Sequence, residues 1–361
     1  MLLQETAERN RANQVFEDLR ALLMTEPIDI SVIICTYNRS VLLPDVLRSV
    51  LHQTVAGINY EVIVVDNNST DDTRIVIHSF IDAGAGKLQY LFEGKQGVSH
   101  ARNAAIEKAR APILAFTDDD VLVAPDWIAT IHRAFEEHPE VGFVGGKVLP
   151  RWLAQPPAWL TPAHWSPLAL QDYGNSPILL NSESKFGLVA ANLAFRRSVI
   201  DEVGNFCSDF QRCQDQIGSL EDHELLLRAM AAGKQGLYFP DLTVIAPVDL
   251  ERMTRRYHRR WHKGHGYFYA KLREPGMERG AAHLFGVPSH LYRQFLGDSM
   301  LCLKDALFGS AGEALLRSER MWFFLGFVKK RVSDFNAERK HNLVREVFQF
   351  LANCGLAVRT K

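Results

Sequence analysis

The sequence feature that most constrains this chain is a short apolar run that ends directly in three adjacent acids. Residues 113–116 read Ile-Leu-Ala-Phe, and Thr117 separates them from Asp118, Asp119 and Asp120. A wholly apolar segment of this length is typical of a central strand in a parallel sheet, and such sheets bind ligands beyond the carboxyl ends of their strands. We therefore expect the three carboxylates at a ligand-binding edge of a sheet.

The chemistry of the three acids favours a divalent cation. Adjacent carboxylates repel one another unless a positive charge lies between them, and Mg²⁺ and Mn²⁺ take oxygen ligands. Alternation along a strand would place Asp118 and Asp120 on one side and Asp119 on the other, so Asp118 and Asp120 could bind one metal. The alternative is an acidic helix start, because Pro125 and Asp126 follow and both residue types begin helices.

Size, charge and cysteine content limit the class of protein. With 361 residues the chain can bury a full core, which favours one α/β domain with appended elements. The formal net charge of −1 argues against a nucleic-acid-binding protein. Five cysteines, an odd number without metal-site spacing, indicate a reducing compartment. Neither a signal peptide nor a membrane-spanning run is apparent in the sequence, so we expect a cytoplasmic protein.

Further apolar runs alternate with helical patterns before and after the acids. Residues 30–35 and 60–65 are each followed by a polar turn and a helical pattern, and residues 87–92 form a weaker run. This alternation predicts an α/β fold with a doubly wound, mostly parallel sheet and helices on both faces. The turns after the first two runs should therefore lie beside the acids.

The later part of the chain predicts more strands, a long loop and a helical extension. Residues 141–148, 185–195 and 237–245 read as strands. Residues 150–177 read as a Pro-rich loop whose three tryptophans could bind sugar rings or anchor the loop. Beyond residue 248 the pattern is helical, first very basic and then amphipathic. We divide the chain into a helical leader (1–27), a core domain (28–248) and a basic and amphipathic helical extension (249–361).

Five short motifs together resemble those of the family 2 glycosyltransferases, which have the GT-A fold and use nucleotide-sugar donors. In chain order they are Thr36-Tyr37-Asn38-Arg39, Val65-Asp66-Asn67-Asn68-Ser69, Ala101-Arg102-Asn103, Asp118-Asp119-Asp120 and Glu221-Asp222. Each motif is weak alone, but all five occur in the order and spacing of the family. The resemblance implies an inverting transferase of cell-surface polysaccharide or glycolipid synthesis, with Mg²⁺ or Mn²⁺ as its cofactor.

The resemblance also implies roles for the residues of these motifs. Asp118 and Asp120 would bind the metal, and Asp222 would be the general base, with Glu221 as the neighbour that raises one pKa of the pair. The alternative for Glu221 and Asp222 is that they only charge the first turn of a helix. The nucleotide donor would contact Thr36, Tyr37, Asn38, Arg39, Asp66, Asn67, Arg102, Asp118 and Asp119.

Three of the donor contacts have structural alternatives. Asp66 could cap a helix instead of binding the donor, although Asn68 or Ser69 could provide that cap. Tyr37 could stack on the nucleobase or simply be packed in the protein. Arg102 could contact a phosphate or form a surface ion pair.

The sequence departs from the family pattern at two positions, which limits the residue roles that the resemblance implies. Asn67 follows Asp66 where many relatives have a second Asp, which leaves the nucleobase open. A His that many relatives have after the last strand is missing, and His258, His262 or His265 could substitute for it.

The partners follow from the same patterns. We expect a nucleotide-diphosphate sugar as donor and a saccharide or glycolipid as acceptor. The basic run at residues 252–263 could bind an anionic membrane surface, which would make the protein peripheral at the inner face of the cell membrane.

Two other functions fit part of the pattern. A nucleotidyltransferase that forms sugar nucleotides shares the sheet and the acidic site, but it should carry a Gly-rich, Lys-containing loop after the first strand, where this chain has Thr36-Tyr37-Asn38-Arg39. A catalytically inactive nucleotide-sugar-binding scaffold would not need the acids Asp118, Asp120 and Asp222. We therefore favour the glycosyltransferase.

Overall fold

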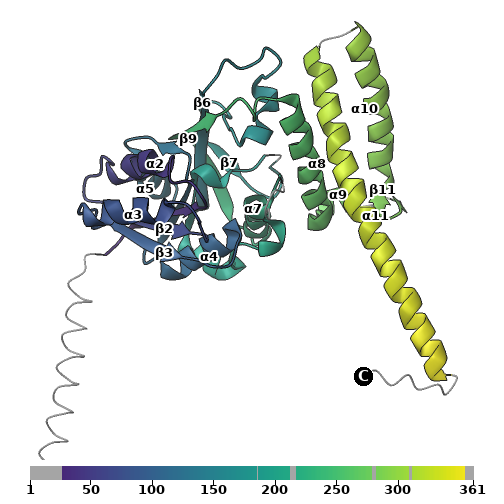
Figure 1. The fold of residues 1–361 in the computed structure, drawn as a ribbon, viewed down its shortest axis with the longest axis horizontal. Helices are drawn as coiled ribbons and strands as arrows, with labels where there is room; N and C mark the ends of the chain where they lie inside the picture. Colours follow the sequence, from purple (N-terminus) through teal and green to yellow (C-terminus); the bar gives the residue numbers. More distant parts are fainter. Residues whose placement is uncertain (1–26, 185, 212–216, 279–281, 309–310, 354–361) are drawn as a thin grey trace, which may run out of the picture.

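The computed structural model describes residues 27–184, 186–211, 217–278, 282–308 and 311–353. The predicted helical leader therefore lies outside the described residues, except for Pro27, and so does Lys185. Figure 1 shows an α/β domain with the C-terminal helices packed along one of its sides.

The first half of the sheet is parallel, as predicted. Its strands are β1 (Ile30–Thr36), β2 (Tyr60–Asp66), β3 (Leu88–Phe92) and β4 (Ile113–Asp118), and they pair in the order β3-β2-β1-β4. The connecting helices are α2 (Leu43–Leu51), α3 (Thr73–Asp82) and α4 (Val98–Lys108). Because these strands are parallel, their carboxyl ends lie at the same edge of the sheet.

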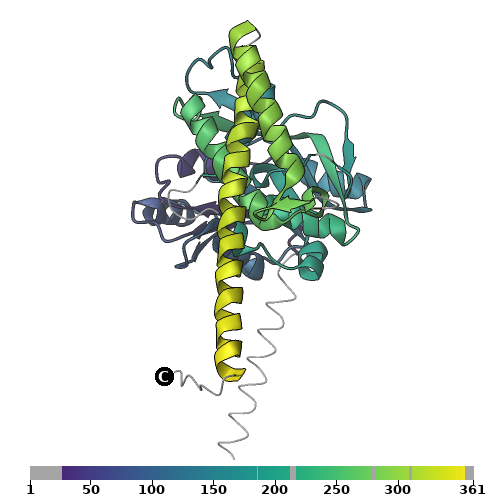
Figure 2. The same cartoon turned by 90° about the vertical axis from the view of Figure 1, so that its right-hand side faces the viewer.

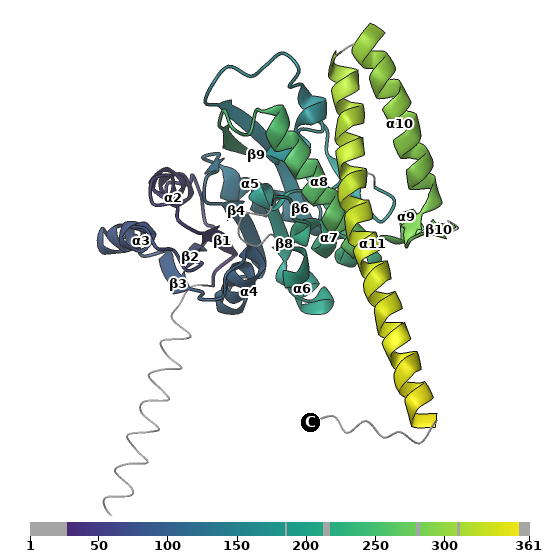
Figure 3. The same cartoon turned by 45° about the vertical axis from the view of Figure 1, so that its right-hand side comes forward.

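The second half of the nine-stranded sheet is mixed. Strand β8 (Leu193–Arg196) runs antiparallel between β4 and β6 (Val141–Trp152), and β9 (Gln235–Val248) is parallel to β6. The short strands β5 (Leu122–Val123) and β7 (Ile178–Leu180) pair with β9 in the antiparallel direction. The α/β prediction is confirmed, and the parallel order is interrupted where β8 is inserted (Figure 3).

The strand predicted over residues 185–195 is wrong in its extent. The chain makes a 3₁₀ turn at Ala190–Asn192 before the strand begins at Leu193. Asn192 is fully buried, and its side-chain amide donates to the carbonyls of Lys147 and Leu242 at 2.9 Å. A buried polar side chain must find partners, so this residue turns the chain instead of continuing the strand.

Helices cover both faces of the sheet, as predicted. One face packs against α2, α3 and α5 (Trp127–Glu137), and the other packs against α4, α6 (Arg197–Val203) and α7 (Glu221–Ala231). Successive residues of β1 separate accordingly, because Val32 and Ile34 belong to the first cluster and Ile33 to the second. The tryptophans of the Pro-rich segment, Trp152, Trp159 and Trp165, pack against the first cluster, which fits the role of anchors.

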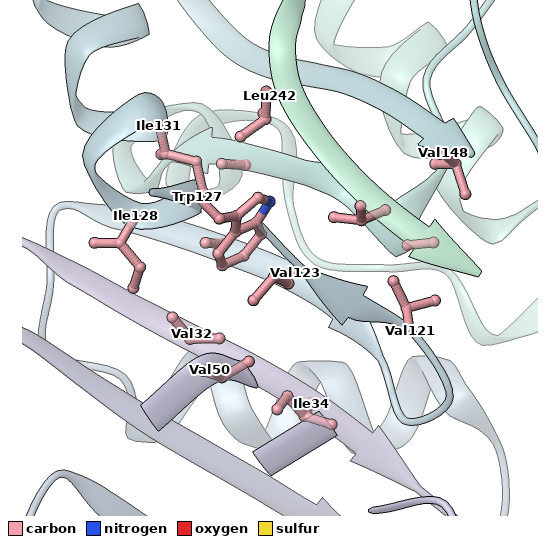
Figure 4. Close-up of a cluster of buried hydrophobic side chains, with 14 of the residues drawn as sticks. Val32, Ile34, Val50, Val121, Val123, Trp127, Ile128, Ile131, Val148 and Leu242 are labelled. Atoms are coloured by element: carbon pink, nitrogen blue, oxygen red, sulfur yellow. The ribbon is translucent and has the colours of Figure 1, made fainter. Parts of the chain in front are cut away.

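Trp127 lies at the centre of the first cluster, between α5 and the sheet (Figure 4). Its ring is fully buried among aliphatic side chains that include Val123 and Ile131. The indole N–H donates to Oδ1 of Asn192 at 2.8 Å, so the polar edge of the ring is also satisfied. This bond connects α5 to the turn that precedes β8.

The extension is helical, as its sequence pattern predicts. It contains α8 (Arg255–Leu272), α9 (Pro275–Glu278), a short hairpin of β10 (His283–Leu284) and β11 (Val287–Pro288), α10 (Ser289–Phe308) and α11 (Ala311–Asn353). Helices α10 and α11 lie side by side, and the C-terminal end of α11 projects past the domain (Figures 1 and 2). Within the described residues, no helix combines the length and apolar character needed to cross a membrane.

We predict that Gly146→Ala strongly destabilises the domain. A Cβ at Gly146 in β6 would overlap the backbone carbonyl oxygen of Leu242 in β9, and backbone cannot move aside as a flexible side chain can. The expected loss in free energy of unfolding is about 3 kcal/mol, the upper end of the range for overpacked cores. Urea denaturation monitored by circular dichroism measures it. Gly86→Ala is the control, because nothing lies within 4 Å of its added Cβ, and equal stability of the two variants would contradict the prediction.

Candidate active site

Three predicted site residues occupy the carboxyl ends of three adjacent strands. In the parallel register Thr36 lies opposite Asp66, and Cys35 lies opposite Asp118. The structure therefore brings the ends of β1, β2 and β4 together, as the sequence predicts.

The turn after β1 is held by the loop after β2. The backbone N–H of Asn38 donates to Oγ of Ser69 at 3.0 Å, and Oδ1 of Asn38 accepts from the backbone N–H of Thr70 at 2.8 Å. The N–H of Ser40 donates to Oδ2 of Asp71 at 3.0 Å. Asn38 itself has a left-handed backbone, with φ of 53°. These bonds give Asn38 a structural role at the edge of the site.

Tyr37 and Arg39 flank Asn38 and remain accessible. Tyr37 is 47% exposed, so its ring is open to a ligand and the packed alternative is wrong. Arg39 points its Nε toward the acidic motif, 3.9 Å from Oδ1 of Asp119. Thr36, the end of the strand, is buried.

Asp66 and Asn67 are buried and bonded to neighbouring loops. Oδ1 of Asp66 accepts from the N–H of Ser69 at 2.9 Å, and Oδ2 accepts from the Tyr90 hydroxyl at 3.1 Å. The Asn67 amide donates to the carbonyls of Glu93 and Lys95, and its oxygen accepts from the N–H of Gly97 at 2.7 Å. Asn67 thus has bonds for all its polar atoms within the protein, whereas each Asp66 oxygen keeps a lone pair.

The helix cap expected at Asn68 or Ser69 is wrong. Helix α3 begins only at Thr73, and Oδ1 of Asp71 accepts from the Thr73 N–H at 3.0 Å. Asn68 is in the left-handed region, with φ of 66°, so the chain turns there and cannot yet enter the helix. Asp66 does not cap the helix either.

The acidic motif crosses the end of its strand. Strand β4 ends at Asp118, and Asp119 and Asp120 lie in the following turn, so strand alternation does not set the directions of their side chains. The side chain of Asp118 is 41% exposed and that of Asp119 is 15% exposed. Burial raises the pKa of Asp119 to about 7, and the charge of Asp120 adds to this effect. The ionised form of Asp119 is therefore disfavoured without a nearby positive charge, and the oxygen donors of the motif fit a hard divalent cation.

Arg102 connects the acidic motif to the Glu-Asp pair. Its Nη1 lies 3.0 Å from Oε1 of Glu221, and its Nη2 lies 3.6 Å from Oδ1 of Asp118. The side chain is only 8% exposed, so the predicted alternative of a surface ion pair is wrong. This buried guanidinium brings into one site carboxylates that are more than one hundred residues apart.

Glu221 and Asp222 begin α7 but differ in environment. Glu221 is buried, and burial together with the charge of Asp222 raises its pKa, while Arg102 opposes the shift. Asp222 is half-buried; its Oδ2 accepts from the N–H of Ala190 at 3.2 Å and its Oδ1 from the N–H of His223 at 2.8 Å. Both acids lie in the first turn of α7, so this geometry also agrees with the alternative that they only charge the start of the helix.

Several supporting residues were not found by sequence reasoning. Gln211 accepts from the N–H of Ser99 in the first turn of α4 at 2.9 Å, and so it holds the helix that carries Arg102. Tyr269 of α8 bonds Nε2 of His223 at 3.0 Å, beside Asp222. Asn192 had a visible signal, because it is the one polar residue in the apolar stretch 188–195.

The histidines considered as substitutes for a late metal ligand have other partners. His258 and His262 lie beside Glu319 of α11, and His265 stacks on Trp261 with ring centroids 4.3 Å apart. These contacts give no support to a role at the acidic motif.

Comparison with known proteins agrees with this geometry. Residues 31–204 match the family model described as Glycosyl transferase family 2. Over 189 residues, 52% of this chain and 58% of the relative, the chain is 30% identical to the glucosyl-dolichyl phosphate glucuronosyltransferase of Haloferax volcanii. Over 107 residues, 29% of this chain and 23% of the relative, it is 40% identical to the validoxylamine A glucosyltransferase of Streptomyces hygroscopicus subsp. limoneus. The chain therefore spans little more than half of the first relative and less than a quarter of the second.

A solved structure shares the fold. The mannosyltransferase PcManGT from Pyrobaculum calidifontis, in complex with GDP-Man and Mn²⁺, superposes with a TM-score of 0.56 at 20% sequence identity. The match covers 85% of this chain and 88% of that structure. Together with the mixed α/β sheet and the five motifs, the family match identifies residues 31–204 as a family 2 glycosyltransferase domain, and the solved mannosyltransferase shows that the fold is shared.

Proposed function

We propose that this chain is an inverting, metal-dependent glycosyltransferase that moves a sugar from a nucleoside-diphosphate donor to a hydroxyl of a saccharide or glycolipid. The observation that carries the proposal is the buried Arg102, which contacts both Asp118 and Glu221 and so joins the acidic motif and the Glu-Asp pair in one site. The names of the two relatives, a glucuronosyltransferase and a glucosyltransferase, support sugar transfer.

Asp118 and Asp120 are the residues that would hold Mg²⁺ or Mn²⁺. When bound, the cation supplies positive charge for the departing diphosphate. The raised pKa of Asp119 agrees with this assignment, because burial and the charge of Asp120 both disfavour its ionised form and a bound cation would stabilise that form. Arg39, 3.9 Å from Asp119, adds a positive charge at the same edge of the site.

Asp222 would accept the proton of the acceptor hydroxyl. As the acceptor oxygen bonds to the anomeric carbon, the bond from that carbon to the diphosphate oxygen breaks on the opposite face, and the proton passes to the carboxylate. Backbone amides of Ala190 and His223 hold the Asp222 oxygens in place. Glu221 does not need to touch the substrate, because its contact with Arg102 positions the start of α7.

Tyr37 and Asp66 are the best placed residues for the nucleoside. The exposed ring of Tyr37 is free to stack on a base, and the Asp66 oxygens can each accept one more hydrogen bond from ribose or base. Asn67 takes no direct part, since its amide already bonds the loop at residues 93–97. Its role is to position the loop before α4.

The rival functions fit less well. The turn after β1 is cross-bonded to the loop after β2 through Asn38, which is unlike a glycine-rich phosphate loop. An inactive scaffold would have no need for a half-buried, backbone-held carboxylate at Asp222, beside the Glu221 that Arg102 connects to the acidic motif. A donor-hydrolysis assay separates a scaffold from an enzyme.

We predict that Asp222→Asn lowers turnover by about 10²- to 10⁴-fold, the loss expected for a general base. An amide keeps the shape and one of the two hydrogen-bond acceptors of Asp222, but it takes no proton. Donor affinity should be unchanged, because the acidic motif and Asp66 are intact. Steady-state transfer assays and donor titration measure the two quantities.

The matched control is Glu224→Gln in the same first turn of α7, where the carboxylate pairs with Arg228 at 2.6 Å. It removes a helix-start charge without touching the proposed base, so it should transfer sugar at nearly the wild-type rate. If the two variants lose turnover equally, or if Asp222→Asn loses donor binding, the assignment of the base is wrong.

We predict that Asp120→Ala removes the metal dependence of nucleoside-diphosphate binding. Affinity in the presence of Mn²⁺ should fall at least about tenfold, because even loss of a residue that only supports a metal ligand costs that much. Isothermal titration with and without EDTA measures it. Asp241→Ala, which removes a surface carboxylate paired with Arg133 at 2.8 Å, is the control. Wild-type affinity in Asp120→Ala, with the same response to EDTA, would refute the metal site.

The extension is proposed to contact an anionic membrane surface. The basic residues of α8 lie on exposed positions, and α10 carries an apolar stripe at helical spacing that is also exposed. The basic set is Arg255, Arg256, Arg259, Arg260 and Lys263, and the apolar set is Leu296, Met300, Leu303 and Leu307. A lipid-linked acceptor and a location at the inner face of the membrane would both agree with these surfaces.

We predict that the protein sediments with liposomes rich in anionic lipid at low salt and is released as salt rises, because exposed charges are screened over about 10 Å at 0.1 M. The double variant Arg256→Glu/Arg260→Glu should lose this binding, whereas Arg133→Glu on α5 should keep it. Sedimentation that does not depend on lipid charge would rule out the basic face as the contact.

A further inference from the structure

A second group of potential metal ligands lies far along the chain from the acidic motif, between α8 and α11. His258 and His262 are four residues apart on α8, so both rings lie on the same face of the helix. Nδ1 of His258 lies 3.2 Å from Oε1 of Glu319, and Nε2 of His262 lies 3.4 Å from Oε2 of the same carboxylate. Among the described residues, this is the only group of three His, Cys, Asp or Glu ligand atoms that lie within 4.8 Å of one another.

The two helices are built to approach closely at this point. A Cβ at Gly266 would overlap the carbonyl oxygen of Phe323, and a Cβ at Gly326 would overlap the carbonyl oxygen of Lys263. Gly266 follows His262 by one helical turn, and Gly326 lies two turns beyond Glu319. The glycines thus bring the backbones together and place the three side chains opposite one another in a buried layer.

Nδ1 of His258 lies within hydrogen-bond distance of Glu319, but the contact of His262 with the same carboxylate matches a metal coordination sphere better than a hydrogen bond. With bonds of about 2.0–2.2 Å, two ligands of a tetrahedral zinc lie about 3.3–3.6 Å apart. The His262 contact of 3.4 Å is in this range, and Nε2 of His262 is buried without a hydrogen-bond partner among the described residues. Nε2 of His262 is thus close to the Glu319 carboxylate without a hydrogen bond to it, as expected for two atoms that bind the same ion.

The charge and burial of the group agree with a dication. The side chains of His258, His262 and Glu319 are 0%, 16% and 4% exposed. As metal ligands, two imidazoles would be neutral and the carboxylate would carry one negative charge, so a bound dication would be partly neutralised by the site.

On the side of the transferase domain the group contacts aromatic and imidazole rings. The ring of Trp159, from the Pro-rich segment, contacts His258 at a centroid distance of 5.0 Å and His164 at 5.7 Å. His164 is buried, and its Nε2 also has no hydrogen-bond partner among the residues described. The group therefore lies where the extension meets the transferase domain.

We propose that His258, His262 and Glu319 form a transition-metal site of the Zn²⁺ class, separate from the acidic motif. Imidazole ligands select Zn²⁺ and related ions, whereas the all-oxygen donors of the acidic motif select Mg²⁺ or Mn²⁺. The ion links α8 to α11 and fixes the helical extension beside Trp159. Its role is structural.

The test measures zinc bound by the full-length protein. Protein stripped with EDTA is incubated with ZnCl₂ in excess Mg²⁺, passed over a desalting column, and assayed for zinc by plasma mass spectrometry. We expect about one zinc per chain. Glu319→Gln and His262→Gln should each bind zinc at least about tenfold more weakly. Co²⁺ in place of Zn²⁺ should give the intense visible absorption of a tetrahedral site.

Two controls locate the ion. His132→Gln is the first control, because His132 is half-buried and lies 3.3 Å from Glu136 with no third ligand among the described residues. This variant should bind zinc like the wild type. Asp120→Ala should also keep its zinc. Circular dichroism checks folding; if Glu319→Gln unfolds, the partly exposed His262→Gln decides. The proposal would be overturned if the wild type did not retain zinc, or if both ligand variants bound zinc as fully as the wild type. It would also be overturned if Asp120→Ala alone lost its zinc.

Discussion

The candidate active site depends on one buried cation. Arg102 is 6% exposed, and its guanidinium lies between Glu221 and Asp118. A buried charge without a partner is strongly destabilising, and removal of one member of a buried ion pair costs about 3–5 kcal/mol. The contact therefore forms only when α4, α7 and the end of β4 are all in place. The same residue that stabilises the assembly also sets the distance between the proposed metal ligands and the proposed base.

The buried side-chain amides of Asn67 and Asn192 hold other parts of the domain in place. Asn67 holds the loop before α4 through three backbone groups, and Asn192 holds β6, β9 and the indole of Trp127 through three hydrogen bonds of its side chain. An amide offers donors and an acceptor in a fixed plane, so each bond constrains the others. Fully bonded buried networks of this kind specify one arrangement of the strands where apolar packing alone would allow several.

Much of the domain could be predicted from the sequence, because runs of apolar residues indicate buried strands and parallel strands end at the same edge of a sheet. This reasoning located β1, β2 and β4 and placed Thr36, Asp66 and Asp118 together. It could not identify Glu221, 119 residues further along the chain, as the ion-pair partner of Arg102. It also extended β8 too far, because a buried Asn turns the chain through contacts with other strands. The pairing of His258 with Glu319, 61 residues on, depends on helix packing that no local pattern reveals.

The cross-bonded turn after β1 has a thermodynamic consequence for donor recognition. Asn38 and Ser40 are tied to Ser69, Thr70 and Asp71 before any ligand arrives. A loop that is already ordered does not lose conformational freedom when it binds, so less of the interaction free energy is consumed in ordering it. The nucleoside side of the site is thus preorganised. Selection of the base should then reflect shape and hydrogen bonding in a rigid pocket, with little contribution from induced fit.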